Sequence, residues 1–574
     1  MISTRGKASI LTTEKLPLRV EAVVAVVAAV GLLIATAYRL HLSTNFTDEA
    51  FYLALPYRFL LGDRMFVDEM NMLQFSSVFT FPLVAGWVRT LGTTGVFLFM
   101  RWMWLLFSCA TGATAFILLK RYVRWPLALL ASMVAVVVMP WGIPALSYNT
   151  MGTGFVLAGC AVGALAVRRE QRRLLVVSGI VHGLAVIVYP TLIVVVPFYM
   201  AIIAWSRKTE RLRWLGMYLL GGLGVGIPAA AALWWTGPAN ILAAYRYTTG
   251  LGTQGGGAAK LAAVAIGFSR ALAGERRLLA GLAVLVALRF VRPAWARWGS
   301  MAVAAFLPLL LLGVSGFSNE NRSLGLVAFW AVSGIVAYAV LERDEGDLMI
   351  FRHIMAPSLV AGAVFAYSSN NGYVNTGIGL LAAAVTASYF VAKLILRSGE
   401  AVLPRFAWAG VVALVPAAVF CALVVQFQYA NFYNDVPLAA QTERITAGPY
   451  AGLATGKANA DVIRGLQRDL STTTRAGDRI LFFDGFPAGY LMTGLRPAAN
   501  TAWLPSPTFA PQMDIAGAVR YFERSGVRPT VAVEVRLWGM EYPPTHPIVR
   551  YLADQGLTPV VTRPDYVIMR NGSP

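Results

Sequence analysis

Charged residues, cysteine and histidine are all scarce in this chain of 574 residues. Only 13% of the residues are charged and 57% are hydrophobic, which excludes a water-soluble domain of this size. The three cysteines, Cys109, Cys160 and Cys421, lie in apolar runs with no spacing pattern, so neither a disulfide framework nor a zinc site is expected. The chain also lacks an internal repeat of fixed period and a low-complexity tract.

Acidic residues are fewer than basic ones, 28 against 48, and the formal net charge is +20. In a soluble protein this balance would indicate nucleic acid as a partner. Here the basic residues lie mostly in short loops between apolar runs, where the positive-inside bias of membrane proteins explains them. We therefore expect the lipid bilayer, and no nucleic acid, as a partner.

Apolar runs of about 17–22 residues recur along the chain, the length that spans a bilayer core as a helix. They predict a polytopic α-helical membrane protein with about thirteen crossings. Residues 76–92 are nearly long enough to cross, but counting them would reverse the charge bias, so they are expected to be interfacial or re-entrant. The first run has no small-residue cleavage site, which favours a retained helix. The predicted spans are 20–38, 98–118, 126–142, 151–167, 174–190, 191–205, 214–235, 277–291, 299–315, 324–341, 355–368, 375–396 and 406–427.

The loops between these runs alternate in charge. Those at 120–125, 168–173, 206–213, 289–297 and 397–405 have a net positive charge, and together with 342–353 they are expected in the cytoplasm with the N-terminus. Residues 39–97, 143–150, 236–276, 315–323, 368–376 and everything after 428 are then expected on the outer side. Arginine greatly outnumbers lysine, as is common in GC-rich bacteria, so we expect the plasma (inner) membrane of a bacterium.

The composition changes from about residue 440. Buried-strand patterns at 478–483, 529–535, 558–562 and 565–571 alternate with helical patterns at 460–470, 516–526 and 546–556. Such alternation predicts a small α/β domain, which the topology places outside the cytoplasm. The expected organisation is a cytoplasmic N-terminus (1–19), a transmembrane domain with an acidic first outer loop at 39–97 (20–430) and an extracytoplasmic α/β domain (431–574).

The first outer loop contains the stretch "STNFTDEAFYLALPYRFLLGDRMFVDE", residues 43–69, with one carboxylate pair near each end. Asp48 and Glu49 precede an amphipathic run. A purely structural interpretation is an interfacial helix whose N-terminus is favoured by the two acids and capped by Thr47. A functional interpretation needs more than this local pattern.

An acidic first outer loop, a juxtamembrane helix, many crossings and an outer α/β domain occur here together. This combination resembles the GT-C glycosyltransferases, in particular the branch of protein mannosyltransferases and the lipid A aminoarabinose transferase. The resemblance is strongest over about 45–125, where "FTDEAFYLALPYRFLLGD" matches the acidic loop and "FSSVFTFPLVAGWVRTLGTTGVFLFMR" leads to Arg101. "ITAGPYAGLATG" (445–456) also resembles the entry to the outer domain in related bacterial sequences.

The resemblance implies that Asp48 is the catalytic base, with Glu49 as its neighbour or as a metal-assisting ligand. A carboxylate suits an acceptor hydroxyl that must lose its proton as it attacks. Positive charge is needed where the leaving phosphate develops negative charge, and Arg58, Arg101 and Arg322 are the main candidates, with Arg246 and Lys260 behind them. The sequence departs from the family in two places. Tyr148 and Asn149 stand where many members have an acid, and Tyr189 stands where some have a lysine, so these three are expected to complete the donor phosphate and sugar site.

Asp68 and Glu69 form the second carboxylate pair. They could bind a divalent cation, Mg²⁺ or Mn²⁺, cap the following segment or remain solvated. Carboxylate pairs without further spaced acids are weak metal signals.

The expected function is an inverting glycosyltransferase. It would move a sugar from a polyprenyl-phosphate donor to a hydroxyl of a cell-envelope glycan, glycolipid or protein. The alternatives are a transporter or flippase of a lipid-linked sugar and a non-catalytic scaffold. Transporters usually show internal repeats and charged mid-membrane breaks, which this sequence lacks.

Overall fold

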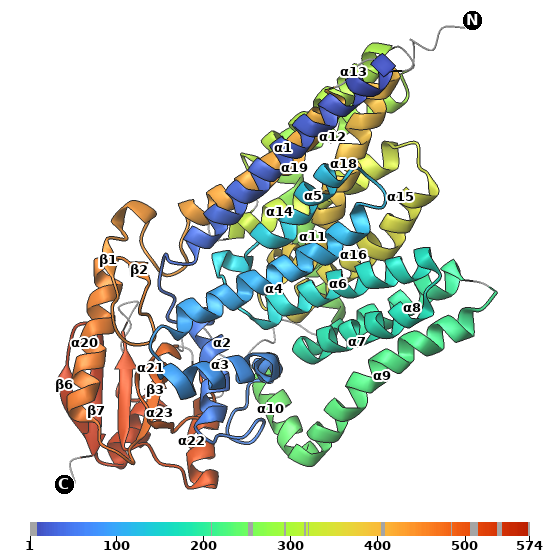
Figure 1. Ribbon diagram of the computed structural model, residues 1–574. Helices are drawn as coiled ribbons and strands as arrows, with labels where there is room; N and C mark the ends of the chain where they lie inside the picture. Colours follow the sequence, from blue (N-terminus) through green and yellow to red (C-terminus); the bar gives the residue numbers. More distant parts are fainter. Residues whose placement is uncertain are drawn as a thin grey trace, which may run out of the picture.

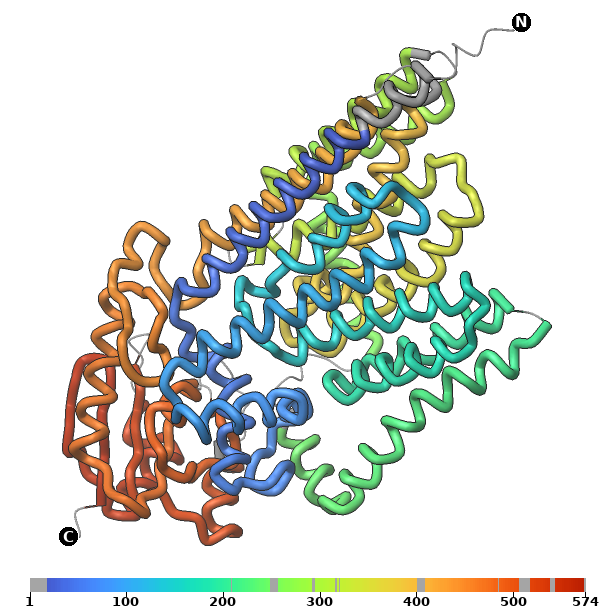
Figure 2. Tube along the Cα trace, viewed as in Figure 1, coloured from blue at the N-terminus to red at the C-terminus, as the bar shows by residue number. Residues whose placement is uncertain are grey.

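The computed structural model describes residues 8–207, 209–250, 257–291, 294–314, 317–318, 321–402, 408–483, 485–504, 515–536 and 542–571. A long helical bundle occupies most of the molecule, and a smaller sheet-containing domain lies at one end of it (Figure 1). The chain path places residues after 440 beside the end of the first helix (Figure 2). The predicted fold class, a polytopic helical protein with a C-terminal α/β domain, is therefore confirmed.

Every predicted span coincides with a helix. The ends differ by up to twelve residues, at the start of α1, because apolar content locates a crossing better than it locates a helix boundary. The corresponding helices are α1 (Ala8–Arg39), α4 (Val96–Leu119), α5 (Trp125–Val137), α6 (Tyr148–Arg169), α7 (Arg172–Val188), α8 (Val195–Ser206), α9 (Arg211–Thr236), α12 (Arg276–Arg289), α13 (Ala294–Phe306), α14 (Arg322–Val340), α16 (Ala356–Ser368), α18 (Leu381–Val402) and α19 (Ala409–Ala430).

Within the described residues, eight helical segments are long and apolar enough to cross a bilayer: Leu18–Arg39, Val96–Leu119, Tyr148–Arg169, Arg211–Thr236, Arg322–Val340, Glu345–Ser368, Leu381–Gly399 and Ala409–Ala430. Shorter apolar helices lie at Trp125–Val137, Pro190–Ser206 and Trp295–Leu311. Several of the long segments expose large apolar side chains, as helices that face lipid do; Val27 and Ile34 of α1 and Ile227 of α9 are each more than 60% exposed. The chain is a multi-pass membrane protein.

Residues 236–276 were expected to be one outer loop. Instead they contain two helices, α10 (Pro238–Gly250) and α11 (Gly257–Gly274). Helix α11 packs against α12 and α16. Its small residues (Gly257, Ala258, Ala259, Ala262, Ala263 and Ala265) combine with Lys260 and Arg270, so it lacks the long apolar run by which a span is recognised in a sequence.

Two short helices lie between the bundle and the C-terminal domain (Figure 1). Helix α2 (Asp48–Leu60) follows the acidic stretch, and α3 (Ser77–Leu91) occupies the segment predicted to be interfacial or re-entrant. The two helices pack against each other. Helix α3 has 15 residues, which is shorter than the candidate spans. Four of these residues are buried.

The C-terminal domain contains a five-stranded mixed sheet in the order β4-β3-β5-β7-β6. Strand β3 (Arg479–Phe483) pairs in parallel with β4 (Arg496–Pro497) and with β5 (Val531–Val535), whereas β7 (Tyr566–Asn571) is antiparallel to β5 and to β6 (Leu557–Thr562). All five residues of β5 are buried, as expected of a central strand covered on both faces. The helices are α20 (Lys457–Thr473), α21 (Ala488–Met492), α22 (Ile515–Ser525) and α23 (Pro547–Asp554).

A short segment joins this domain to the acidic loop. Strands β1 (Glu443–Arg444) and β2 (Ala454–Thr455) pair, and Ala454 also exchanges backbone hydrogen bonds with His41 and Ser43 at 2.8 Å. The Tyr450 ring stacks on Phe97 with 4.0 Å between the ring centroids. The stretch 445–456 thus contacts both the end of α1 and the start of α4.

Candidate active site

Asp48 is the first residue of α2 and lies where α1, α2 and the segment after α19 meet. The backbone N–H groups of Thr47 and Glu49 both donate to Asn45 Oδ1, at 3.1 and 3.0 Å. Asn45, and not the predicted Thr47, therefore caps the helix; the Thr47 side chain makes no capping hydrogen bond. The Asp48 carboxylate lies at the positive end of the helix dipole.

Burial is the main influence on the acidity of Asp48 and raises its pKa to about 6. Hydrogen bonds from the Tyr433 and Thr47 hydroxyls and from backbone act in the opposite direction. None of these groups is a cation, and within the described residues Asp48 takes part in no ion pair. A carboxylate with a pKa near 6 is mostly ionised at neutral pH and is still a useful proton acceptor.

Aromatic rings surround Asp48. Tyr52, one helical turn further along α2, and Tyr148 are near enough to be affected by the charge of Asp48. The rings of Tyr52 and Tyr148 meet edge to face at 5.5 Å, and Tyr148 stacks on Tyr189 at 5.6 Å. Tyr189 ends α7 and donates to or accepts from Ser368 Oγ at 2.7 Å.

Two amide groups beside these rings have unused hydrogen-bonding atoms. Asn45 Nδ2 and Asn149 Oδ1 are buried and have no hydrogen-bond partner among the described residues. Buried polar atoms are normally paired, so a donor and an acceptor of this kind indicate a polar ligand. The structure thus brings Asp48, Tyr148, Asn149 and Tyr189 into one region.

Glu49 points away from this group and pairs with Arg101. Arg101 Nε and Nη2 donate to the two oxygens of Glu49, each at 2.6 Å, and both side chains are 2% exposed. The remaining Arg101 N–H groups donate to the carbonyls of Leu40, Leu42 and Ser43 at 2.7–3.0 Å. Since every Arg101 donor already has an acceptor, we assign this arginine to the loop and not, as the sequence suggested, to the donor phosphate.

Arg58 differs from the prediction for the same reason. Its guanidinium is fully buried and donates to Asp63 at 2.7 Å, to Glu69 at 2.9 Å and to the carbonyls of Asp68 and Ala499. Glu69 also accepts from the backbone N–H groups of Asn71 and Ala502. Arg58 therefore joins α2 to the C-terminal domain, and four of its five N–H donors are already used within the protein.

The second carboxylate pair does not suit a metal ion. Glu69 is held by Arg58, and Asp68 accepts from Arg64 at 3.2 Å and from the Tyr521 hydroxyl at 3.3 Å. The described residues include no group of three or more His, Cys, Asp or Glu placed to hold a metal. Asp68 and Glu69 therefore do not form the expected site for a divalent cation, because their oxygens already accept hydrogen bonds from arginines.

Arg322 begins α14 and is the predicted phosphate ligand that the structure leaves available. Its guanidinium lies 5.8 Å from the ring centroid of Phe427, and its buried Nε has no hydrogen-bond partner among the described residues. Phe427 lines a small pocket that Tyr433, the hydrogen-bond partner of Asp48, also lines. One neighbour of Arg322 and one neighbour of Asp48 therefore line the same small pocket.

Sequence reasoning missed Arg39 and Tyr433. Arg39 is buried at the end of α1 and donates to the carbonyls of Gln428, Leu42 and Gly142 without contacting a carboxylate. Gly142 and Gln428 line the pocket beside Arg322. An arginine at the outer end of the first span was a detectable signal, whereas Tyr433 lies 385 residues after Asp48 and had none.

Of the weaker candidates, Lys260 lies over Tyr367 and Arg246 lines another cavity.

No protein-family model and no curated protein matches the chain. Similar solved structures are ArnT from Cupriavidus metallidurans, apo and bound to undecaprenyl phosphate, each at 16% identity and TM-score 0.41. They cover 95% and 96% of this chain and 97% and 98% of that one. The Archaeoglobus fulgidus oligosaccharyltransferase, in complex with Zn and sulfate, is 12% identical with a TM-score of 0.47, covering 96% of this chain and 73% of that one. Both are membrane glycosyltransferases of the kind that the sequence resembles, but likeness of this degree leaves the chemistry to be decided by the site's own residues.

Proposed function

We propose that the chain is an inverting glycosyltransferase that takes a sugar from a polyprenyl-phosphate donor. The observation that carries the proposal is Asp48 itself. It is a desolvated carboxylate without a cation partner, at the end of a membrane-spanning bundle, among tyrosines and unpaired amides that suit a sugar. The elements grouped around it are those expected on the outer face of a bacterial plasma membrane, so this face is where we place the reaction.

Asp48 acts as general base in this mechanism. The acceptor hydroxyl attacks the anomeric carbon from the face opposite the phosphate, and its proton passes to an Asp48 oxygen. The new bond joins the acceptor oxygen to the anomeric carbon, while the bond from that carbon to the phosphate oxygen breaks. The electron pair leaves with the polyprenyl phosphate, and the configuration at the anomeric carbon is inverted. Partial burial keeps Asp48 basic enough to take the proton near neutral pH.

Arg322 provides positive charge for the leaving phosphate. Its unpaired Nε is a donor in need of an acceptor, and a guanidinium binds phosphate oxygens with good geometry. Tyr148, Tyr189 and Asn149 bind the sugar between this arginine and Asp48. Glu49, Arg101 and Arg58 act indirectly, because their ion pairs hold the loop that carries Asp48.

The decisive experiment replaces Asp48 by Asn in the full chain reconstituted in liposomes with a polyprenyl-phosphate sugar. We expect kcat to fall about 10²–10⁴-fold, the contribution usual for a general base. Polyprenyl phosphate released into the lipid phase is the measurement. The parent's rate should fall about tenfold per pH unit below pH 6, since the base is then protonated. Asp461→Asn, at an exposed aspartate paired with Lys457, is the control and should retain the rate.

A flippase would give a different result. It would move the lipid-linked sugar between leaflets without releasing polyprenyl phosphate, and its activity would survive Asp48→Asn. Full turnover in that variant, or translocation without bond cleavage in the parent, would contradict the proposal.

A further inference from the structure

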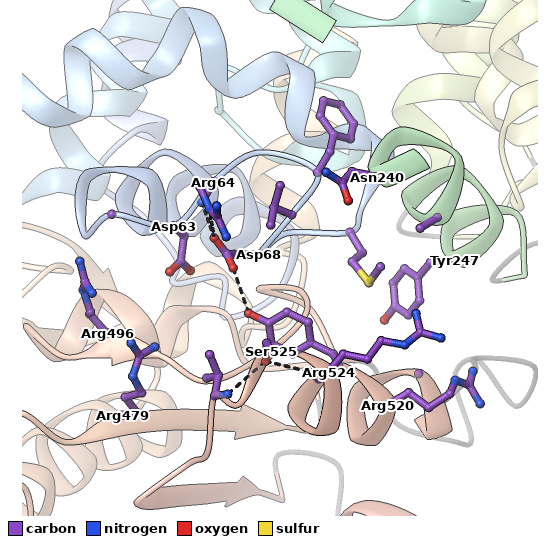
Figure 3. A pocket seen from close by; sticks show the side chains of 18 of the residues that line it. Asp63, Arg64, Asp68, Asn240, Tyr247, Arg479, Arg496, Arg520, Arg524 and Ser525 are labelled. Carbon is purple, nitrogen blue, oxygen red and sulfur yellow. Dashed lines mark hydrogen bonds and ion pairs between the residues drawn. The ribbon is translucent and has the colours of Figure 1, made fainter. Parts of the chain in front are cut away.

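A second, larger cavity lies at the other end of α2. It has a volume of about 840 Å³ and is lined by the loop after α2, by α10 and by β3, β4 and α22 of the C-terminal domain (Figure 3). Asp48 begins α2 and the cavity begins just past its last residue. Thirteen helical residues separate the two, or about 20 Å at 1.5 Å per residue.

The lining of this cavity is strongly basic. Six arginines face two aspartates, a net charge of +4: Arg64, Arg246, Arg479, Arg496, Arg520 and Arg524 against Asp63 and Asp68. Both acids are already paired within the protein. Asp63 accepts from Arg58 at 2.7 Å, and Asp68 accepts from Arg64 and Tyr521. They therefore do little to neutralise the other arginines.

Three of the arginines have no carboxylate partner in the described part of the chain: Arg479, Arg496 and Arg524. Arg479 and Arg496 are direct neighbours in the parallel pairing of β3 with β4. Like charges in such a position repel each other, and an anion between them would relieve this repulsion. Arg496 is also fixed in place, because its Nε donates to the Leu61 carbonyl at 2.9 Å and its Nη2 lies where a Cβ at Gly62 would be.

We infer that this cavity binds the acceptor, and that the acceptor is an anionic glycan carrying phosphate or carboxylate groups. Arginine forks pair with both groups. Four of the six arginines belong to the C-terminal domain and not to the bundle, which favours a glycan in water over a lipid headgroup. Naming the ligand an acceptor rests on the proposed function. The spacing of about 20 Å then requires an oligosaccharide, with its anionic groups in the cavity and its reacting hydroxyl at Asp48.

Binding can be measured without turnover. The full chain, in nanodiscs of neutral phosphatidylcholine, is titrated with fluorescent inorganic polyphosphate and with fluorescent polygalacturonate. We expect binding that weakens as salt rises. Arg479→Glu with Arg524→Glu should weaken it about a hundredfold, about tenfold for each charge-assisted contact that is lost. Arg479→Gln with Arg524→Gln tests the same contacts without charge reversal, should the first pair fail to fold.

The matched control is Arg444→Glu with Arg550→Glu, which changes the net charge equally at two exposed arginines outside the cavity. It should leave the affinity within about twofold. Equal weakening by both pairs, or no binding of either probe, would overturn the inference. Competition by phosphatidic acid added to the nanodiscs would also overturn it, because the site would then accept a lipid headgroup. Asp48→Asn should bind the probes normally, so this measurement tests the acceptor site separately from the catalytic base.

Discussion

The acidic loop carries the same two-residue sequence twice, Asp48-Glu49 at the start of α2 and Asp68-Glu69 after its end. Each glutamate is buried and paired with a buried arginine, Glu49 with Arg101 and Glu69 with Arg58. Neither aspartate pairs with these two arginines, and Asp68 lines the basic cavity. The two pairs differ in one respect: Asp68 has Arg64 beside it, whereas Asp48 has only hydroxyl and backbone donors.

This difference separates a base from a structural acid. A cation within about 4 Å stabilises the charged carboxylate and makes it a poorer proton acceptor, while burial without a cation does the opposite. The glutamates hold the loop, and the position of the aspartate relative to an arginine decides whether it can do chemistry.

The largest expected effect on stability comes from breaking the glutamate pairs. Glu49→Gln leaves the buried Arg101 guanidinium without its counter-charge, so it should lower the free energy of unfolding by about 3–5 kcal/mol. Glu69→Gln should cost less, because Asp63 still pairs with Arg58 at 2.7 Å. Thermal unfolding of the full chain in detergent measures this. Glu443→Gln, at an exposed pair with Arg464, is the control and should cost under about 1 kcal/mol. An undisturbed Glu49→Gln protein would mean that Arg101 is free to leave its pair and would restore it as a phosphate ligand.

A smaller effect of opposite sign is expected for Asp48→Asn. Folding raises the pKa of Asp48 from an ordinary value of 3.8 to about 6, so ionisation of this group opposes folding. The parent should lose stability relative to the variant as the pH rises from 4 through 6, by on the order of 1–3 kcal/mol. Unfolding curves of both proteins at pH 4 and pH 8 test this. A variant that is less stable at pH 8 would show that Asp48 makes a stabilising ion pair after all.

The smallest effect should follow the loss of the cation beside Asp68. Arg64 is 72% exposed, and exposed pairs contribute little. Arg64→Ala should change the free energy of unfolding by less than about 1 kcal/mol. The same thermal measurement applies, and a change as large as that of Glu69→Gln would mean that Asp68 and Glu69 act as one unit.

Much of the fold followed from the sequence because bilayer crossings have a fixed length and composition. The predicted spans all fall on helices, and the strands at 478–483 and 529–535 appear as β3 and β5. Helix α11 was missed because its face is built from alanine and glycine and is interrupted by charge. Strands β1, β2 and β4 were missed because two residues carry no periodicity.

Only part of the candidate site could be predicted from the sequence. Asp48 stood out through its place after the first span, and Tyr148, Asn149 and Tyr189 through their places at span ends. The roles of Arg58 and Arg101 could not be read in the same way. A sequence shows that an arginine lies near a membrane surface, but whether its donors are free depends on carbonyls and carboxylates up to 441 residues away.

The sequence by itself determined that this chain crosses a membrane many times, carries its acids in the first loop and ends in an α/β domain. These properties depend on local composition and periodicity, which each segment carries alone. Only the tertiary structure decided which acid keeps its charge unpaired and which arginines remain available to a ligand. Ion pairing and desolvation depend on neighbours that the fold brings together from distant parts of the chain.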